Sequence, residues 1–395
     1  MKIESIRLKN FRMFREVSIK QLPNCCVFVG ANGTGKTSLF DVFRFLRDAL
    51  TYNVKQALAR RGGFKEVVSR GTSGPIELEL KCRDLEAISS NVTYLLVIDL
   101  VENQPVVKRE VLKYQQGHRG EVRHFLDFSL GKGTVITDEN DSEQLPHVEL
   151  KREEKQLESP NILALKGIGQ LKKFELPNEL RRFFENGHFS ELQISEAKKV
   201  DSSAGYDEHL SSTGDNLALF AQTLYNNYPK RYGEVMREMA RRVPGLAKIE
   251  PVTEKGRIFL EFHNELFKEP FQLWQVSEGT LQLFAYMLLL YDPNPYPLLC
   301  AEEPEHQIYP DLLMLLAEEF SGYAGRGEGQ VFVSTHSPDF LNGTRLERIF
   351  WLTPKNGYTQ IHTTASEPLL KRLVDVGDLP GALWKQGFFE GAHPW

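Results

Sequence analysis

The segment from Gly30 to Thr37 constrains this chain more than any other stretch of its sequence. It reads Gly-Ala-Asn-Gly-Thr-Gly-Lys-Thr, which has the spacing of a phosphate-binding loop. The apolar run Cys25–Val29 before it predicts a buried strand, and apolar residues at helical spacing from Lys36 to Leu50 predict a helix after it. Strand, glycine-rich loop and helix in direct succession are the context that this motif requires, which disfavours the alternative of a chance glycine-rich turn.

The residue types of the loop suit a nucleoside triphosphate. Glycines let backbone N–H groups surround the phosphate oxygens, and the helix N-terminus adds a positive dipole. We expect Lys36 to reach the β- and γ-phosphates and the Thr37 hydroxyl to bind Mg²⁺. ATP and Mg²⁺ are therefore the predicted cofactors. The predicted nucleotide contacts in this segment are Gly30, Ala31, Asn32, Gly33, Thr34, Gly35, Lys36, Thr37 and Ser38.

A second chemical signal is the acidic pair that ends the apolar run from Leu298 to Ala301. A phosphate-transferring site needs one group for Mg²⁺ and one that activates water. Glu302 is expected to serve the metal through a bound water, and Glu303 is the candidate general base. Two acids after an apolar strand can also be a solvent-facing strand end. The phosphate-binding loop favours the functional interpretation.

Two further segments have the expected spacing for such a site. Ser277 and Gly279 open a predicted helix about 20 residues before the acidic pair, where a helix N-terminus can meet a phosphate bound to a second subunit. By itself this segment would be only a helix cap. The apolar strand from Val331 to Ser334 leads to His336, which can sense or polarise a γ-phosphate. The alternative for His336 is a lone surface histidine.

The remaining pattern predicts an α/β protein with a core sheet, an attached antiparallel sheet and a helical insertion. Alternating segments between Ile76 and Phe128 predict the antiparallel strands. The expected parts are residues 1–130 with the loop and that sheet, 131–245 as the helical insertion, and 246–395 with the remaining motifs. A basic, amphipathic helix from Lys230 to Val243 closes the insertion. Core packing and an interaction surface both remain possible for it.

Composition places limits on partners and location. The formal net charge is −5, so a protein that coats nucleic acid over its whole surface is excluded, although a local DNA contact is not. No apolar run reaches the ~20 residues that span a bilayer, and the first residues lack a signal-peptide pattern, so we expect a cytoplasmic protein without a membrane segment. The four cysteines have no metal-ligand spacing and are expected to be reduced and buried.

Together the motifs resemble those of the RecF/SMC/OLD-type ABC ATPases, and most resemble the compact bacterial "AAA family" ATPases of defence-type gene pairs. The resemblance covers both ends of the chain. It is carried by Leu8-Lys9-Asn10-Phe11-Arg12, the phosphate-binding loop, Ser277-Glu278-Gly279-Thr280, Glu302-Glu303-Pro304-Glu305 and Thr335-His336-Ser337-Pro338.

The resemblance implies an ABC-type ATPase head that acts as a homodimer or higher homo-oligomer, with two ATP molecules at a shared interface. It implies that Arg12 contacts nucleotide, that Ser277 and Gly279 reach the nucleotide of the opposite subunit, that Glu303 activates water and that His336 is a switch histidine. The chain departs from the usual pattern in having Glu302 at the metal position instead of aspartate. No glutamine could be assigned to the usual glutamine loop.

Such a head supplies a switch, and something attached to it must do the work. Because 59 residues follow His336, too few for the nuclease domain of OLD-type relatives, we expect a separate effector, for example a nuclease, in bacterial defence against phage or foreign DNA. The alternative is a RecF-like DNA-binding ATPase in repair or replication. The aromatic tail either packs on its own head or forms a protein interface; its apolar residues are Leu383, Trp384, Phe388, Phe389 and Trp395.

Overall fold

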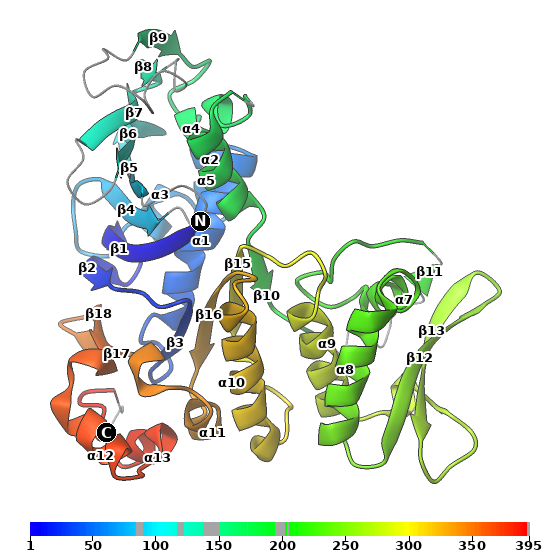
Figure 1. Ribbon diagram of the computed structural model, residues 1–395. Coiled ribbons are helices and arrows are strands. Elements are labelled where there is room, and N and C mark those ends of the chain that lie inside the picture. Colours follow the sequence, from blue (N-terminus) through cyan, green and yellow to red (C-terminus); the bar gives the residue numbers. More distant parts are fainter. Residues whose placement is uncertain are drawn as a thin grey trace. The chain divides into compact units, whose positions relative to one another are not determined.

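A computed structural model describes residues 1–83, 90–116, 122–136, 151–171, 173–193, 202–203 and 205–392 (Figure 1). The chain forms two compact units. The first consists of Met1–Gly187, Phe350–Thr363 and Phe389–Trp395, and the second of His188–Ile349 and Thr364–Phe388. The domain boundaries that the sequence analysis placed after residues 130 and 245 stay predictions. Among the described residues no helix has both the length and the apolar character needed to span a bilayer.

The first unit contains an antiparallel sheet of eight strands in the order β2-β1-β4-β5-β6-β7-β8-β9. The predicted strands between Ile76 and Phe128 are confirmed, and two more strands continue the sheet into a stretch for which helices were expected. The bounds are β1 Lys2–Phe11, β2 Phe14–Lys20, β4 Ile76–Arg83, β5 Ser90–Val101, β6 Gln104–Gln116, β7 Val122–Ser129, β8 Lys132–Ile136 and β9 Arg152–Gln156.

Alternation of side chains explains how this sheet packs. Along β4 every second residue, from Ile76 to Cys82, is buried, while Lys81 and Arg83 are exposed. Helices of the same unit supply the apolar partner, with α1 contacting α2 and α5, and α2 contacting β6 (Figure 1). These helices are α1 Lys36–Thr51, α2 Val54–Ala59, α3 Phe64–Val67, α4 Ala164–Ile168 and α5 Glu175–Glu185.

The strand before the phosphate-binding loop lies in the core of the first unit. All five residues of β3, Cys25–Val29, are buried, as the apolar run predicted. The ring of Phe28 stacks on Phe350 at 5.2 Å and meets the edge of Phe40 on α1 at 6.3 Å. Phe350 belongs to β17, Ile349–Lys355, which pairs antiparallel with β18, Tyr358–Thr363. Aromatic packing therefore fixes the strand on one side of the loop and the helix on the other.

The second unit contains three parallel strands, β10 His188–Ser190, β15 Leu298–Glu302 and β16 Gln330–Thr335. It also holds a small antiparallel sheet in which β13 pairs with β11, β12 and β14. These strands are β11 Ser202–Ser203, β12 Leu246–Glu254, β13 Arg257–Asn264 and β14 Phe271–Gln272. The helical segments are α7 Leu217–Asn227, α8 Pro229–Arg242, η1 Leu273–Gln275, α9 Glu278–Leu290, α10 Pro310–Gly325, α11 Pro338–Asn342, η2 Leu346–Arg348, η3 Thr364–Ser366, α12 Pro368–Asp375 and α13 Pro380–Lys385.

The basic helix predicted near Lys230–Val243 is α8, and its contacts support the core-packing alternative. Tyr232, Val235 and Met239 are buried. Arg242 is nearly buried as well, and its guanidinium donates hydrogen bonds to Glu238 and to Glu319 on α10. A positive charge in this position is therefore compensated within the unit.

The aromatic tail packs largely on its own chain. Leu383 and Trp384 on α13 are buried in the second unit. Phe389 is buried in the first unit, where its ring meets Trp351 at 5.6 Å. Phe388 is 39 % exposed, so an interface role stays open for that ring. Trp395 lies outside the described residues.

A buried carboxylate joins the large sheet to α4. Glu110 on β6 has no exposed surface. Its carboxylate accepts hydrogen bonds from the backbone N–H groups of Ala164 and Leu165 and from the Tyr94 hydroxyl. Burial raises the pKa of Glu110 to about 7, although these hydrogen bonds act in the opposite direction. The carboxyl group therefore changes charge near neutral pH.

This pKa predicts how the stability of the first unit depends on pH. The folded chain holds the Glu110 proton more tightly than the unfolded chain, so the stabilisation is complete below about pH 4.5 and is lost as pH rises through about 7. The loss amounts to about 3 kcal/mol in unfolding free energy. Urea unfolding between pH 5 and 8 should show this decline for the wild type and a flatter profile for Glu110→Gln. The control Glu154→Gln, at an exposed carboxylate on β9, should keep the wild-type slope. Equal slopes for the wild type and Glu110→Gln would contradict the assignment.

Candidate functional site

The phosphate-binding loop has the backbone that its glycines predict. Gly33 and Gly35 have φ of 79° and 97°, in the left-handed region that favours glycine. A Cβ on Gly35 would also lie 2.6 Å from Thr359 Oγ1, so no larger residue fits there. Gly35 directly precedes α1, whose first turn contains no acidic residue and no side-chain cap. No acidic side chain in the first turn therefore competes with an anion for this helix end.

Hydrogen bonds from β18 hold the loop in place. Thr359 Oγ1 donates to Thr34 O at 2.7 Å, and Thr359 N donates to Met13 O at 2.8 Å. Inside the loop, Thr34 Oγ1 donates to Ala31 O at 2.8 Å. The shape of the loop is thus set by neighbouring strands as well as by its own glycines.

Lys36 is the cation of this loop, and it is only 6 % exposed. Its ammonium donates to Gly30 O at 2.7 Å and to Ala31 O at 3.2 Å. Carbonyl dipoles compensate a buried charge less well than an anion does, so a phosphate is the better partner. Thr37, the next residue, is exposed and available to a metal. Among the described residues no cluster of three or more metal-ligating side chains exists, but Mg²⁺ bound to phosphate needs only one or two protein oxygens. The donor set therefore fits a magnesium–triphosphate.

A cavity of about 510 Å³ lies beside the loop within the first unit. Arg12, with φ of 49°, lines it together with Ser38 of α1. Arg12 donates a hydrogen bond to Asp41, which also accepts one from Arg61 at 2.8 Å. The other lining residues are Met13, Glu66, Val68, Arg70, Asn356, Gly357 and Tyr358. Arg12 thus lines a cavity together with the first turn of α1 and is hydrogen-bonded to Asp41, while its contact with nucleotide stays a prediction.

In the second unit Glu302 and Glu303 lie at the end of β15. Glu302 pairs with Ser334 in the parallel register, and Glu303 N donates to Ser334 O at 2.8 Å. Glu303 then leaves the strand with φ of 47°. The carboxyl ends of β15 and β16 meet at one edge, so the residues after them lie close together.

The Glu303 carboxylate lies between two imidazoles. His306 Nε2 is 2.9 Å from Glu303 Oε2, and His336 Nδ1 is 3.6 Å from Glu303 Oε1. Glu303 and His336, which the sequence analysis proposed separately, therefore lie close together in this unit. His306 was not predicted, although its position three residues after Glu303 is a spacing at which side chains can meet in a turn.

Glu305 fixes the strand end from which His336 projects. Its side chain is 7 % exposed, and Oε1 accepts hydrogen bonds from Thr335 Oγ1 and His336 N, both at 2.8 Å. His336 Nδ1 lies 3.3 Å from the same oxygen. Sequence analysis included Glu305 only as part of a motif. The hydrogen bonds that Glu305 accepts from Thr335 and His336 N depend on the pairing of β15 with β16, which brings the two strand ends together.

The segment from Ser277 to Thr280 begins α9. Ser277 is exposed, and its Oγ accepts a hydrogen bond from Thr280 N at 3.2 Å, so it is a helix cap as the simpler alternative stated. Gly279 touches the backbone oxygen of Gln307, leaving no space for a Cβ. Gln307 Nε2 donates to Glu278 Oε2 at 2.6 Å. This segment is therefore fastened to the loop that follows Glu303.

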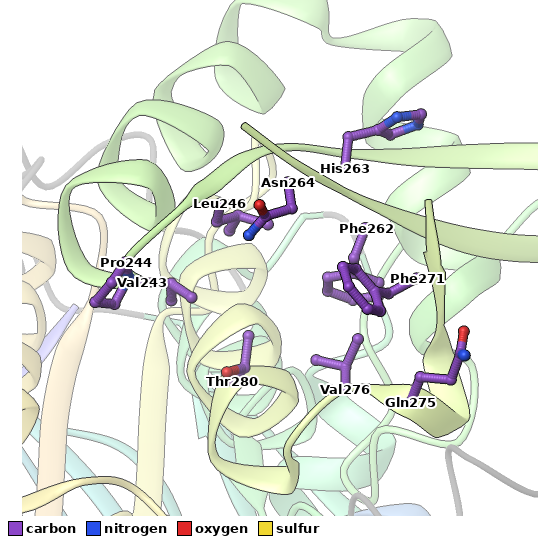
Figure 2. Close-up of a pocket in the computed structure, with 10 residues that line it drawn as sticks. All are labelled: Val243, Pro244, Leu246, Phe262, His263, Asn264, Phe271, Gln275, Val276 and Thr280. Atoms are coloured by element: carbon purple, nitrogen blue, oxygen red, sulfur yellow. The ribbon is translucent and has the colours of Figure 1, made fainter. Parts of the chain in front are cut away.

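Beside the first turn of α9 lies a smaller cavity of about 210 Å³, also within the second unit. Figure 2 shows Phe262 and Phe271 together on one side and Thr280 on α9. The remaining lining residues are Val243, Pro244, Leu246, His263, Asn264, Gln275 and Val276. Its largely apolar lining does not match a phosphate site.

The predicted residues therefore form two groups. Lys36 and Thr37 begin α1 in the first unit, and Arg12 lines a cavity there together with the next residue of that helix, Ser38. Glu303 comes together with His336 in the second, where Ser277 begins a helix fastened to the same loop.

Comparison with known proteins shows the family. A family model described as "AAA domain, putative AbiEii toxin, Type IV TA system" matches residues 25–342. The DNA replication and repair protein RecF of Listeria innocua is 30% identical over 154 residues, which are 36% of this chain and 41% of that protein. RecF of Idiomarina loihiensis is 35% identical over 74 residues, 19% of each chain. The chain thus spans about two fifths, or less, of the curated relatives that it matches.

Among solved structures, the SmcHead bound to the C-winged helix domain of ScpA has a similar fold, with a TM-score of 0.55 over 92% of this chain and 98% of that one. The sequence identity is 12%, so this similarity concerns the fold alone. The family match covers most of the chain and includes the phosphate-binding loop, the acidic pair and His336. The chain accordingly belongs to the family of AAA domains described by that model, and its motifs and fold are those of an ABC-class P-loop ATPase, similar to RecF in sequence and to an SMC head in fold.

Proposed function

We propose that this protein binds and hydrolyses Mg²⁺–ATP and uses the cycle as a switch that controls a separate effector. The observation that carries the proposal is the buried Lys36 in a glycine-rich loop at the N-terminus of α1, where its ammonium donates to Gly30 O and Ala31 O. A triphosphate in this loop would meet the lysine cation and the positive end of the helix dipole at the same place. The Glu303 carboxylate, held near two imidazoles, supplies the second requirement of an ATPase.

Binding is assigned to the first unit. Backbone N–H groups from Gly33 to Thr37 would donate hydrogen bonds to the phosphates, and the Lys36 ammonium would reach the β- and γ-phosphates. The cavity lined by Arg12 is large enough for the nucleoside. Mg²⁺, when bound, neutralises phosphate charge, and Thr37 is the residue of this unit that would hold it; Glu302, at the end of β15, stays the second metal residue predicted from the sequence.

Hydrolysis is assigned to the second unit. Glu303 would take a proton from water while the water oxygen forms a bond to the γ-phosphorus. The bond from that phosphorus to the β–γ bridging oxygen breaks, and ADP leaves with its electron pair. His336, beside Glu303, would respond to the presence of the γ-phosphate.

Two substitutions separate binding from hydrolysis. Glu303→Gln keeps the side-chain shape but removes the base, so ATP should bind with near wild-type affinity while turnover falls at least about a hundredfold. Lys36→Ala should weaken ATP binding itself, since it removes the cation of the loop. Calorimetry measures the affinity for ATP, and the rate of phosphate release measures turnover. Near wild-type turnover by Glu303→Gln would move the base to another residue.

We further propose that two chains associate when ATP is bound. Ser277 is exposed at the N-terminus of α9, where the helix dipole favours an anion, and it would face the nucleotide of the partner subunit. ATP would then join two heads, and loss of the γ-phosphate would release them.

Light scattering tests this association. Glu303→Gln with ATP should run as a dimer or larger assembly, because bound ATP is not consumed. Ser277→Arg in that background should remain monomeric while still binding ATP. Ser366→Arg, at an exposed serine of the same unit, is the matched control and should associate. Association of the Ser277→Arg protein equal to that of the control would contradict the head-to-head arrangement.

Bacterial defence is the role that we propose for the switch, since the family description names a toxin of a toxin–antitoxin system. The alternative, DNA repair or replication, is favoured by the RecF relatives at 30–35% identity. Both are roles for a cytoplasmic protein.

One set of proteins separates these roles. Anisotropy measurements with duplex DNA should show no ATP-dependent binding by Glu303→Gln if the protein controls an effector. Cells that carry the wild-type protein with its neighbouring genes should restrict phage growth, and cells that carry Glu303→Gln should not. Tight ATP-dependent duplex binding without any effect on phage would favour the repair role.

A further inference from the structure

We propose that His306 is a positioning residue for Glu303, holding the carboxylate in the orientation from which it activates water. This inference rests on the proposed hydrolytic function. Its basis is the contact between His306 Nε2 and Glu303 Oε2 at 2.9 Å.

The two oxygens of Glu303 have different surroundings. Oε2 is at hydrogen-bond distance from His306, whereas Oε1 lies 3.6 Å from His336 Nδ1, beyond that distance. A neutral His306 with its proton on Nε2 would donate to Oε2 and fix the plane of the carboxylate. The second histidine, His336, is closer to Glu305, at 3.3 Å.

The backbone explains why Glu303 needs such a contact. With φ of 47°, Glu303 has left the extended geometry of β15, and the strand no longer sets the direction of its side chain. The turn that follows is short, with His306 N donating to Glu303 O at 3.2 Å. The same turn therefore carries both the carboxylate and the imidazole that contacts it.

The far side of this turn is fastened to the start of α9. Gln307 Nε2 donates to Glu278 Oε2 at 2.6 Å, and the Gln307 backbone oxygen touches Gly279. Gln307 itself has φ of 64°, so its backbone is constrained as well. His306 thus has little freedom to move away from Glu303, which is the condition for a positioning role.

The exposure of the His306 side chain indicates how its removal should affect folding stability and hydrolysis. Its side chain is 64 % exposed, and exposed charge pairs contribute little to folding stability. Removing the imidazole should therefore change hydrolysis without unfolding the protein. A histidine that acted as the base itself would instead have to transfer a proton, which a glutamine in its place cannot do.

Steady-state ATPase assays with His306→Ala, His306→Gln and Glu303→Gln test the proposal. His306→Ala should lower kcat about tenfold, with KM for ATP and the melting temperature nearly unchanged. Glutamine places an amide N–H near the position of Nε2, so His306→Gln should recover kcat to within about threefold of the wild type. His124→Ala is the matched control, because His124 is also a partly exposed histidine near a carboxylate, Asp127, and should have wild-type kinetics.

Three results would overturn the positioning role: a wild-type kcat for His306→Ala, equal inactivity of His306→Ala and His306→Gln, or a fall in melting temperature that accounts for the lost activity. Each leaves the proposed function intact if Glu303→Gln remains inactive. Full activity of Glu303→Gln would instead remove the proposed base, and the role of His306 with it.

Discussion

The buried charge of Lys36 is the interaction on which the phosphate-binding site depends. A lysine this deeply buried requires a partner, and the loop offers it the carbonyl oxygens of Gly30 and Ala31. Those groups are available because the loop curls back over the start of α1. The fold thereby places the Lys36 ammonium beside a helix N-terminus that has no acidic side chain in its first turn. Both features lower the free energy of an anion at the same place.

In the second unit the constraint is strand register. Because β15 and β16 are parallel and pair Glu302 with Ser334, the residues that follow each strand reach the same edge of the sheet. Glu305 then ties the two strand ends together through Thr335 and His336 N. The Glu305 carboxylate thus stabilises the strand ends beside Glu303, the residue that is proposed to act on water.

Elements whose structure depends mainly on neighbouring residues could be predicted from the sequence. The strand at Cys25–Val29 and the helix that begins at Lys36 were predicted because their apolar periodicities are strong and the glycines between them leave one arrangement. Glu303 and His336 were each singled out because they follow an apolar strand, but their proximity depends on the parallel pairing of β15 with β16. The association of Arg12 with Asp41 could not be predicted, because it joins residues 29 positions apart. The His306 contact was missed for another reason: it depends on the left-handed backbone of Glu303, which glutamate rarely adopts.

The N-terminal residues of the first unit do not hold the phosphate-binding loop in place by themselves. The hairpin β17–β18 comes from residues 349–363, yet its Thr359 donates to Thr34 O and to Met13 O. Tyr358 on the same hairpin donates to Arg70 O and lines the cavity beside Arg12. Without these groups the loop would lose its fixed backbone and the cavity one of its walls. Because contacts so distant in sequence carry a large loop-closure cost, the loop acquires its final shape only when the C-terminal part of the chain has joined the first unit.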